Sequence, residues 1–531
     1  MRKILLLLTL ALGGFIFGQS SLNMSLLARA TYMNDNNDIW GYTDSVGTEY
    51  ALVGTTAGVS IVDISTNQPQ KKQFIQGPYS IWRDLKTWDH YAYVTHDNPF
   101  VWNTIPSQGL LIIDMDSVNQ PSPRFKTINF LIPDTLGGYD TLKTAHNLYI
   151  DENGFCYLFG ANIRTGGALI FDLNDDPWNP TYAGMWDTYY LHDGMVRGDT
   201  LWGSAVYDGV FVVVDVSIKD SSFMVASKGT PNAFTHNTWI SDNNQTLFTT
   251  DEVGGAFLTA YDVSDLSNMT ELDRIQSMPG TSVIPHNAHV YGQWVVTSYY
   301  TSGVQIVDAK FPELLVEVGF YDTSPNYFGN GFNGNWGAYP YFESEKIICS
   351  DIEEGLYVLE PDYVSASRVH IQVVDSISRA PLSNAIVEFD VADIDGLSNI
   401  DGLADLGTPL FGNDSVAISL SGYVTANATY NWLPGQFDTL RVALLNVNHI
   451  GVGDDQLPAI TMYPNPSNGR IHLSGLDSAS FVLSDLSGRV LERGIVYKEA
   501  LQLRGQYACG QYLLKVVSNQ GIHTFPLMLR L

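Results

Sequence analysis

The chain has 531 residues, a formal net charge of -29 at pH 7 and only 27 Lys and Arg residues, a balance that opposes binding to nucleic-acid phosphates. Hydrophobic residues make up 45% of the chain and charged residues 16%, so there are enough apolar side chains for packed cores. The length exceeds what one core supports, and frequent glycine favours short strands joined by tight turns. We therefore expect an all-β protein of several domains.

The N-terminus has the layout of a secretory signal peptide. Arg2 and Lys3 precede an apolar run over residues 4–17, and Gly18 follows it. We therefore expect residues 1–19 to be removed during export. The run is short for a bilayer span and no run of 18 apolar residues occurs later, so the sequence predicts no transmembrane segment in the mature chain.

One type of segment recurs seven times in the next part of the chain. Each copy holds a strand, a turn that usually contains Gly, and an apolar strand that usually ends in Asp. The spacing of the copies is the length of a four-stranded propeller blade with variable loops, so we expect a seven-bladed β-propeller over residues 20–364. The copies end at Asp63, Asp114, Asp172, Asp215, Asp262, Asp308 and Glu360.

The two ends of this repeat region indicate how the ring closes. The last copy has no obvious fourth strand after Glu360, while a lone strand at residues 24–32 precedes the first inner strand. Because open strand edges invite aggregation, we expect the N-terminal strand to complete the seventh blade.

Several segments of the repeat region resemble a known family. NDIWGYTD, EYALVGTTAGVSIVDIS, TAHNLYID and GLYVLEPD are similar to the LVIVD-type repeats of the choice-of-anchor B family, and the resemblance covers residues 23–362. It implies a β-propeller attached to an exchangeable anchor, and it implies no particular reaction.

A different pattern begins at Arg368, with strands and turn residues but no blade signature. The segments RVHIQVVDSISRAPLSNAIVEFDV and SVAISLSGYVTANATY resemble a carboxypeptidase-regulatory-like β-sandwich over residues 365–447, which acts as a spacer. A run of carboxylates there offers oxygen ligands for calcium, but it lacks the EF-hand spacing, and we favour polar turns. The run is Asp393, Asp395, Asn399 and Asp401.

A linker at residues 448–458 leads to the last module, residues 459–531. ITMYPNPSNGRIHLSG, FVLSDLSGRVL and GQYLLKVVSNQG closely resemble a type A sorting domain of the type IX secretion system, a small β-sandwich. The resemblance implies transport across the outer membrane by the type IX secretion machinery. The product is then extracellular or attached to surface lipopolysaccharide. The ending LMLRL departs from the more usual lysine-rich terminus.

Polar residues recur where the seven inner strands begin, and four consecutive blades offer histidine. Turns between second and third strands should lie at the same mouth, which adds Asp97, Asp208, Asp251, Glu252 and Asp351. The pairs at the strand starts are Asn37 with Asp38, Arg83 with Asp84, His146 with Asn147, His192 with Asp193, His236 with Asn237, His286 with Asn287, and Trp336 with Gly337.

This ring has two interpretations. The first interpretation is a divalent metal held by His146, His192, His236 and His286, because imidazole and carboxylate are natural ligands for zinc, iron or manganese. The other is a structural device that repeats with the blades and satisfies loop amides, and we favour it because catalytic sites are normally asymmetric. The residues expected to contact a ligand at the mouth are Arg83, Asp84, Asp208, Asp251 and Trp336.

Three functions remain open from the sequence. The first is a non-enzymatic surface module that binds a glycan, peptide or protein. The second is a metal-dependent hydrolase with Asp208 or Asp251 as the base, and the third is a structural component of the cell surface. No nucleophile elbow, phosphate loop or metalloprotease motif is present, so we favour the first.

Overall fold

The computed structural model describes residues 20–97, 105–447, 460–476, 478–518 and 521–530. The signal peptide and the linker predicted from the sequence lie outside these ranges. The described chain contains strands, one 3₁₀ turn (η1, Met115–Ser117) and no α-helix, which confirms the all-β prediction. No helix in the described ranges is long and apolar enough to cross a membrane.

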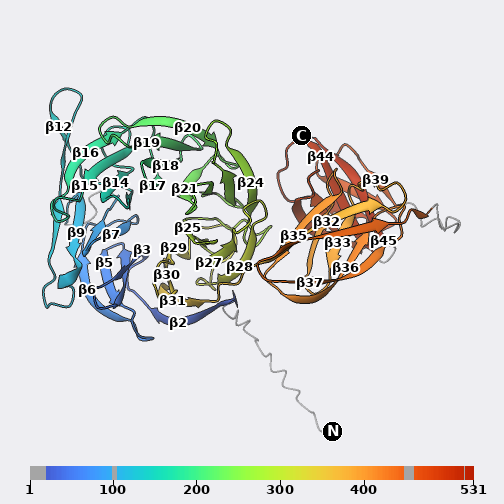
Figure 1. The fold of residues 1–531 in the computed structure, drawn as a ribbon, viewed down its shortest axis with the longest axis horizontal. Coiled ribbons are helices and arrows are strands. Elements are labelled where there is room, and N and C mark those ends of the chain that lie inside the picture. The colour runs from blue at the N-terminus through green and yellow to red at the C-terminus, as the bar shows by residue number, and fades with distance from the viewer. Residues whose placement is uncertain (1–19, 98–104, 448–459, 477, 519–520, 531) are drawn as a thin grey trace, which may run out of the picture.

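Seven antiparallel sheets form a ring around a common centre, with their inner strands nearest the centre (Figure 1). Each sheet is built from strands that follow one another in the chain, except that N-terminal strands join the last two sheets. This is the architecture of a β-propeller. We number the sheets 1 to 7 in chain order. They are β3 (Asn36–Thr43), β4 (Glu49–Thr55), β5 (Gly58–Asp63) and β6 (Gln70–Gln76); β7 (Leu85–Trp88), β8 (Tyr91–Val94), β9 (Leu110–Asp114) and β10 (Phe125–Ile128); β13 (Asn147–Ile150), β14 (Phe155–Phe159), β15 (Ala168–Asp172) and β16 (Thr181–Trp186); β17 (Asp193–Arg197), β18 (Thr200–Ala205), β19 (Val210–Asp215) and β20 (Phe223–Gly229); β21 (Thr235–Ile240), β22 (Thr246–Asp251), β23 (Leu258–Asp262) and β24 (Thr270–Ile275); β25 (Ala288–Tyr291), β26 (Trp294–Ser298), β27 (Val304–Asp308) and β28 (Val316–Tyr321); and β29 (Asn335–Tyr339), β30 (Ile347–Asp351), β31 (Gly355–Pro361) and β2 (Met24–Ala30). A short β1 (Ser21–Leu22) adds to β28, and a hairpin of β11 (Leu131–Pro133) and β12 (Tyr139–Thr141) lies between sheets 2 and 3.

The middle strands of each sheet are apolar on both faces because the sheets pack against each other around the ring. All seven residues of β4 are buried, and so are the four residues from Phe211 to Val214 in β19. Outer strands are more polar, and β6 carries Lys71 and Lys72, which protect a free edge from pairing with another chain. The hydrophobic cores therefore lie between neighbouring sheets.

The N-terminal strand β2 takes the place of the fourth strand in sheet 7. It pairs antiparallel with β31, from Met24 opposite Pro361 to Ala30 opposite Leu356. In sheets 1, 3, 4, 5 and 6 the fourth strand carries one extra residue opposite the end of the third strand, a β-bulge. β2 has the same bulge at the same place, between Leu26 and Ala28. It therefore repeats the geometry of a fourth strand as well as its position.

The aspartates that end the third strands shape turns on the face opposite the mouth. Oδ1 of Asp63 accepts the backbone N–H of Ser65 at 3.0 Å, and Asp215 and Asp262 do the same for the residues two positions on. The hydrogen bonds from Ser217 lower the pKa of Asp215. These repeated aspartates are structural.

Two further groups of sheets follow the ring. Strands β35, β32 and β38 form one sheet and β34, β33, β36 and β37 a second, and both contribute to one core around Phe389 and Trp432. The last seven strands form a single sheet with its own core around Phe481 and Leu514. The bounds are β32 (Ser367–Asp375), β33 (Ile386–Phe389), β34 (Ile394–Leu397), β35 (Leu403–Thr408), β36 (Gly412–Ser419), β37 (Ala426–Trp432), β38 (Phe437–Leu444), β39 (Thr461–Tyr463), β40 (Arg470–Ser474), β41 (Ser478–Ser484), β42 (Val490–Tyr497), β43 (Ala500–Gln502), β44 (Gly510–Ser518) and β45 (Gly521–Leu529).

Two of the four residues considered for calcium, Asp395 and Asn399, make contacts within the protein. Asp395, in β34, forms an ion pair with Arg493, in β42, at 2.6 Å. This pair links the sheets of residues 367–444 to the C-terminal seven-stranded sheet. The side chain of Asn399 accepts the backbone N–H groups of Asp401 and Leu403, as in a polar turn. These contacts agree with the structural interpretation of the run.

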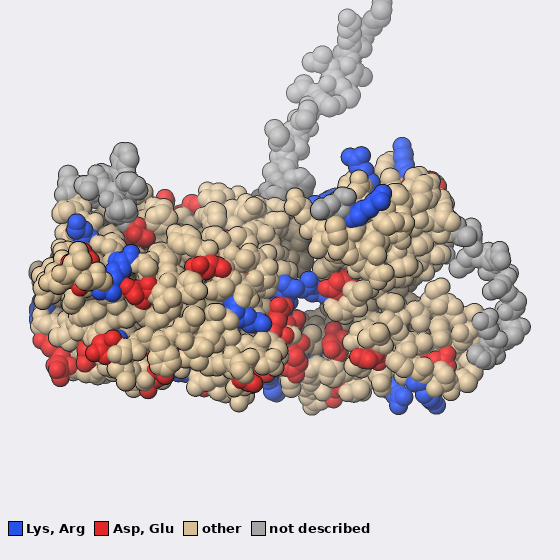
Figure 2. All heavy atoms as spheres, turned by 90° about the horizontal axis from the view of Figure 1, so that it is seen from above, with Lys and Arg blue, Asp and Glu red and all other residues tan. Residues whose placement is uncertain are grey.

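A buried ion pair joins the ring to the sheets that follow. Arg368, in β32, and Asp308, at the end of β27, both have fully buried side chains, with Nη1 of Arg368 3.4 Å from Oδ2 of Asp308. Arg368 also donates to the backbone carbonyls of Asp308 at 2.6 Å and Leu314 at 2.8 Å. Charged groups of both signs gather where the ring meets the C-terminal sheets (Figure 2). The contact is therefore partly electrostatic.

Candidate functional site

Four histidines from four consecutive sheets form a curved row at the mouth of the central channel. His146 directly precedes the inner strand β13, and His192 directly precedes β17. His286 lies two residues before β25, and His236 lies in β21. The ring centroids are 4.1 Å apart for His146 and His192, 4.1 Å for His192 and His236, and 4.5 Å for His236 and His286. The four histidines selected from the sequence therefore lie next to one another.

The second residue of three predicted pairs, Asp84, Asp193 and Asn237, ties neighbouring inner strands together. Oδ2 of Asp84 accepts the backbone N–H of Leu148 in the next sheet at 2.9 Å. Asn237 donates to Oδ2 of Asp193 at 2.9 Å, and its oxygen accepts the N–H of Ala288 at 3.0 Å. These contacts support the structural interpretation for this half of the ring, because each side chain satisfies a backbone or side-chain group of the adjacent sheet.

A buried charge cluster lies beside this layer. Nζ of Lys86, in β7, is 2.7 Å from Oδ1 of Asp84 and 4.3 Å from the centroid of Trp40. Burial alone would lower the pKa of Lys86, but the carboxylates of Asp84 and Asp38 outweigh burial and raise it. Burial and the charge of Asp84 raise the pKa of Asp38 well above its usual value. Lys86 therefore supplies the positive charge that stabilises the two buried carboxylates of Asp84 and Asp38.

Aromatic side chains pack beside Lys86 and His289. The ring of His289 lies 4.6 Å from Trp239 and 6.0 Å from Trp40, and Tyr341 contacts all three rings. His289 is buried, and burial followed by the charge of Lys86 lowers its pKa to about 3.

The buried His289 makes the ring sensitive to acid. Its pKa is about 6.5 in the unfolded chain and about 3 in the folded one, so between these values only the unfolded chain takes up the proton. The free energy of unfolding should therefore fall by about 1.4 kcal/mol for each pH unit below 6.5 on account of this group. We expect His289→Leu to remove that part of the slope in denaturant titrations at pH 7 and pH 5.

A second substitution serves as control for this prediction. His370→Leu changes a histidine of the sheets that follow the ring and tests whether the loss of any histidine alters the slope. An unchanged pH slope in His289→Leu would contradict the assignment of acid sensitivity to this position.

The space enclosed by the row of histidines is small. A cavity of about 20 Å³ is lined by the histidines of the row, by Trp82 and Trp336 at its sides and by Asp38, Arg83, Asp84, Asn147 and Asn287. That volume admits one water molecule or one ion. It leaves no room in the channel for an organic substrate.

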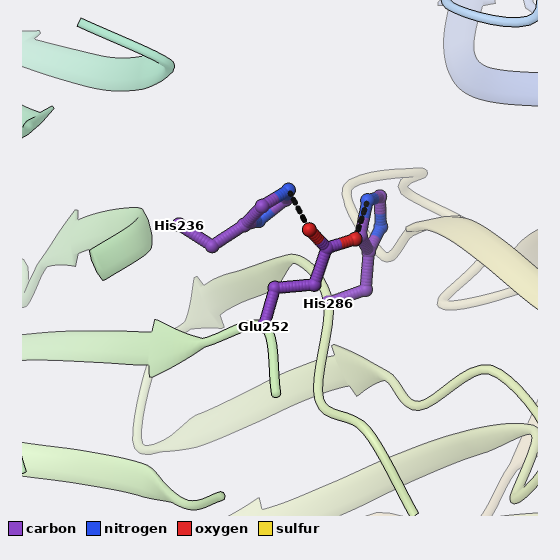
Figure 3. Close-up of side chains that lie close together, drawn as sticks. All are labelled: His236, Glu252 and His286. Atoms are coloured by element: carbon purple, nitrogen blue, oxygen red, sulfur yellow. Dashed lines mark ion pairs between the residues drawn. The ribbon is translucent and has the colours of Figure 1, made fainter. Parts of the chain in front are cut away.

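Two turn carboxylates reach the row of histidines. Oδ2 of Asp97 is 2.9 Å from Nδ1 of His146. Glu252, in the turn after β22, places its two oxygens 3.6 Å from Nε2 of His236 and 3.8 Å from Nε2 of His286 (Figure 3). Burial raises the pKa of Glu252 to about 7, while a hydrogen bond from the Tyr300 hydroxyl opposes the increase.

The other predicted carboxylates do not join them. Asp208 is exposed at the tip of the β18–β19 turn and does not line the cavity. The Asp251 carboxylate accepts hydrogen bonds from Thr230, Asn232 and Phe234 and so holds the loop before β21. Asp351 likewise accepts from the backbone of Glu353 and Glu354. Asp208 and Asp251 are therefore not placed to act as a base on anything bound in the channel.

The remaining predicted contact residues lie at the mouth with different roles. Arg83 is buried and donates to the carbonyls of Thr55 at 3.1 Å and Pro78 at 2.6 Å, so its guanidinium is occupied by the backbone. Asp84 is paired with Lys86. Trp336 stands 5.0 Å from His286, and its carbonyl accepts from Nδ1 of that histidine at 2.5 Å. Of the three, Trp336 has the side chain that is least occupied by polar partners.

Burial keeps most of the row uncharged. The pKa of His192 and of His236 lies well below the usual value, chiefly because of burial and then because of the neighbouring histidines. Burial also lowers the pKa of His286 to about 3. Neutral imidazoles are the form that binds metal ions.

Three residues of the site were not selected from the sequence. Glu252 was placed at the mouth but not among the ligands, and Tyr300 and Lys86 were not singled out. A signal existed for Lys86, because a lysine at the second position of an inner strand replaces an expected apolar residue. Tyr300 occupies the turn of sheet 6 that corresponds to the Glu252 turn of sheet 5, and that comparison points to it.

Comparison with known proteins adds little. No described protein family and no curated protein sequence matches the chain. Among solved structures, the chain is similar to the β-propeller domain of Cps50 (Swd1) from Myceliophteria thermophila, at 10% identity and a TM-score of 0.44 over 64% of this chain and 100% of that one.

Proposed function

We propose that the protein is a secreted or cell-surface-attached binding module. In this proposal a seven-bladed propeller of the choice-of-anchor B type presents its mouth to a glycan, peptide or protein. A carboxypeptidase-regulatory-like sandwich serves as the spacer, and a type A sorting domain directs export through the type IX secretion machinery. The signal-peptide pattern of residues 1–19 and the motifs of residues 459–531 support this location.

One observation carries the proposal: apolar side chains are exposed around the mouth, while the channel beneath them holds only about 20 Å³. Tyr207 at the β18–β19 turn is 77% exposed, and Phe328 and Phe332 between β28 and β29 are 76% and 59% exposed. Trp82, before β7, is 38% exposed. Antiparallel sheets bring these loops to one end of the ring, because first strands begin where second strands end.

The exposed rings suit a partner that lies across the mouth. Aromatic faces stack on sugars and on extended peptides, and rigid aromatic residues carry much of the energy of binding surfaces. Phe332 packs edge-on against Tyr300, 5.4 Å away, so this ring is held in place from below. The net charge of -29 disfavours anionic polymers.

The hydrolase alternative finds less support. Its proposed bases, Asp208 and Asp251, lie outside the cavity or are held by loop amides. The cavity admits a water molecule but no scissile bond.

Removing the exposed rings tests the proposal. We expect the triple variant Tyr207→Ala, Phe328→Ala and Phe332→Ala to lose at least tenfold in affinity for whatever the intact chain captures on glycan and peptide arrays. Tenfold is about 1.4 kcal/mol, which is the order of one or two stacking contacts. Affinities of the captured probe are then measured by biolayer interferometry.

The control changes an equally exposed ring at the outer edge. Phe223, in the fourth strand of sheet 4, is 57% exposed, and Phe223→Ala should bind as the parent does. Capture of no probe by the parent chain, or equal affinity of parent and triple variant, would reject the mouth as the binding surface.

A further inference from the structure

Three side chains from two neighbouring sheets converge on one point above the channel. His236 and Glu252 belong to sheet 5, and His286 precedes the first strand of sheet 6. Their ligand atoms all lie within 4.8 Å of one another, and Figure 3 shows the carboxylate between the two imidazoles. Oε2 of Glu252 lies 3.6 Å from Nε2 of His236, and the other oxygen, Oε1, lies 3.8 Å from Nε2 of His286. Two ligands of a tetrahedral ion bound at 2.0–2.1 Å are about 3.4 Å apart, so each imidazole and the oxygen that faces it are separated by nearly the span of one ion.

The hydrogen bonds of His286 fix which of its nitrogens carries the proton. Nδ1 lies 2.5 Å from the carbonyl oxygen of Trp336, and a carbonyl only accepts, so Nδ1 must donate. In the neutral ring Nε2 then holds a lone pair, and it faces Oε1 of Glu252. This use of a backbone carbonyl to orient a ring is typical of histidines that bind metals.

Glu252 is short of positive partners. Among the described residues, its carboxylate accepts one hydrogen bond, from the Tyr300 hydroxyl at 2.5 Å, and both imidazole contacts exceed hydrogen-bond distance. A largely buried carboxylate that faces the lone pair of His286 Nε2 is unfavourable unless a cation lies between them. The backbone of His286 makes a hydrogen-bond contact with the ring of His236.

We propose that His236 Nε2, Glu252 and His286 Nε2 bind one divalent transition-metal ion of the zinc type, with a water molecule from the adjoining cavity as the fourth ligand. The site ties sheet 5 to sheet 6. Since the cavity of about 20 Å³ admits water alone, the ion stabilises the ring and does not act on a substrate. The proposal is independent of the binding surface at the mouth.

The ligand set selects the class of metal. Two imidazole nitrogens and one carboxylate suit zinc, ferrous iron, cobalt or nickel, whereas calcium and magnesium prefer six or more oxygens. The other two histidines do not join the site. Among the described residues, the ligand atoms that lie within 4.8 Å of one another at this place belong to His236, Glu252 and His286 alone. His146 is also engaged by Asp97.

A second group of possible ligands serves as an internal comparison. His90, Asp114 and Asp116 also place their ligand atoms within 4.8 Å of one another. Asp114 is already paired with Arg124 at 3.1 Å, so a cation there competes with an existing partner.

The test is titration of the full chain with Zn²⁺ after treatment with a chelator. We expect one Zn²⁺ per chain by calorimetry, a higher melting temperature with Zn²⁺, and at least 100-fold weaker binding in Glu252→Gln and in His286→Gln. Glu252→Gln keeps the shape of the side chain and an oxygen for Tyr300. His192→Gln and His90→Ala are controls that should keep the parental affinity.

X-ray absorption at the zinc edge identifies the ligands of Zn²⁺ bound to the parent chain, so it needs no substitution. We expect two imidazoles with further oxygen ligands, even if a variant fails to fold. Absence of stoichiometric binding would overturn the proposal. A spectrum that shows three or four imidazole ligands would also overturn it. So would a loss of Zn²⁺ binding in His192→Gln or His90→Ala while Glu252→Gln still binds Zn²⁺.

Discussion

Replacing Lys86 by methionine should lower the free energy of unfolding of the ring by about 3–5 kcal/mol at pH 7, the usual cost of removing one partner from a buried ion pair. Lys86, Asp84 and Asp38 are all buried at the channel. Without the ammonium group, two buried carboxylates face each other beside a cavity that admits only one water molecule or ion. Methionine keeps the apolar stem of the side chain beside Trp40, so the loss measures charge and not packing.

The deficit of Lys86→Met should depend on pH. Without Lys86 the folded-state pKa values of the two carboxyls rise above those of the unfolded chain. A raised pKa gives stability that is present at low pH and is lost as pH rises through the folded-state value. The variant should therefore approach the parent as the pH falls from 7 towards 5. Urea titrations of both chains at pH 7, 6 and 5 measure this.

A double variant provides the matched control for Lys86. Lys86→Met with Asp84→Asn removes the charge that the lysine neutralises and keeps an oxygen that can accept the N–H of Leu148. We expect the double variant to regain more than half of the lost stability at pH 7. A double variant as unstable as Lys86→Met would show that the lysine acts through packing against Trp40 and not through its charge.

Repetition explains why much of the ring could be predicted. The third strands of the repeats end in Asp, the turns that follow are stabilised by that Asp, and each copy contributes the same kind of sheet. The position of the four histidines followed from the same alignment, because equivalent residues of a ring point to a common axis. Sequence spacing is enough where every copy obeys one geometry.

The asymmetric features of the site could not be predicted in this way. Asp251 and Glu252 are adjacent in one turn, yet the first binds loop amides and the second faces the histidines. Which of the two neighbouring carboxylates turns inward depends on the conformation of the loop at residues 230–234. The spacing of residues in the sequence does not predict that conformation. The row formed by the imidazoles likewise depends on the orientation of each ring. The positions of the histidines in the sequence do not predict these orientations.

The largest effect that we expect comes from removing the N-terminal strand. A chain that begins at residue 32 lacks β2 and leaves β31 with an unpaired edge in the sheet that closes the ring. It also loses Met24 and Ala28, which pack in two separate core clusters beside Val358 and Leu359. We expect it to lose cooperative thermal unfolding and to aggregate, because strand pairing and burial are lost together at the point of closure.

Complementation distinguishes loss of pairing from a general intolerance of truncation. A synthetic peptide of residues 20–32 should restore a cooperative transition when it is added to the truncated chain during refolding, because β2 contacts β31 through register pairs along its length. A chain that begins at residue 23 loses only β1, which pairs with β28 at two positions, and should unfold nearly as the full chain does. If the chain that begins at residue 32 folds cooperatively without the peptide, ring closure does not depend on β2. The bulge that β2 shares with five fourth strands would then be a consequence of pairing and not a requirement for it.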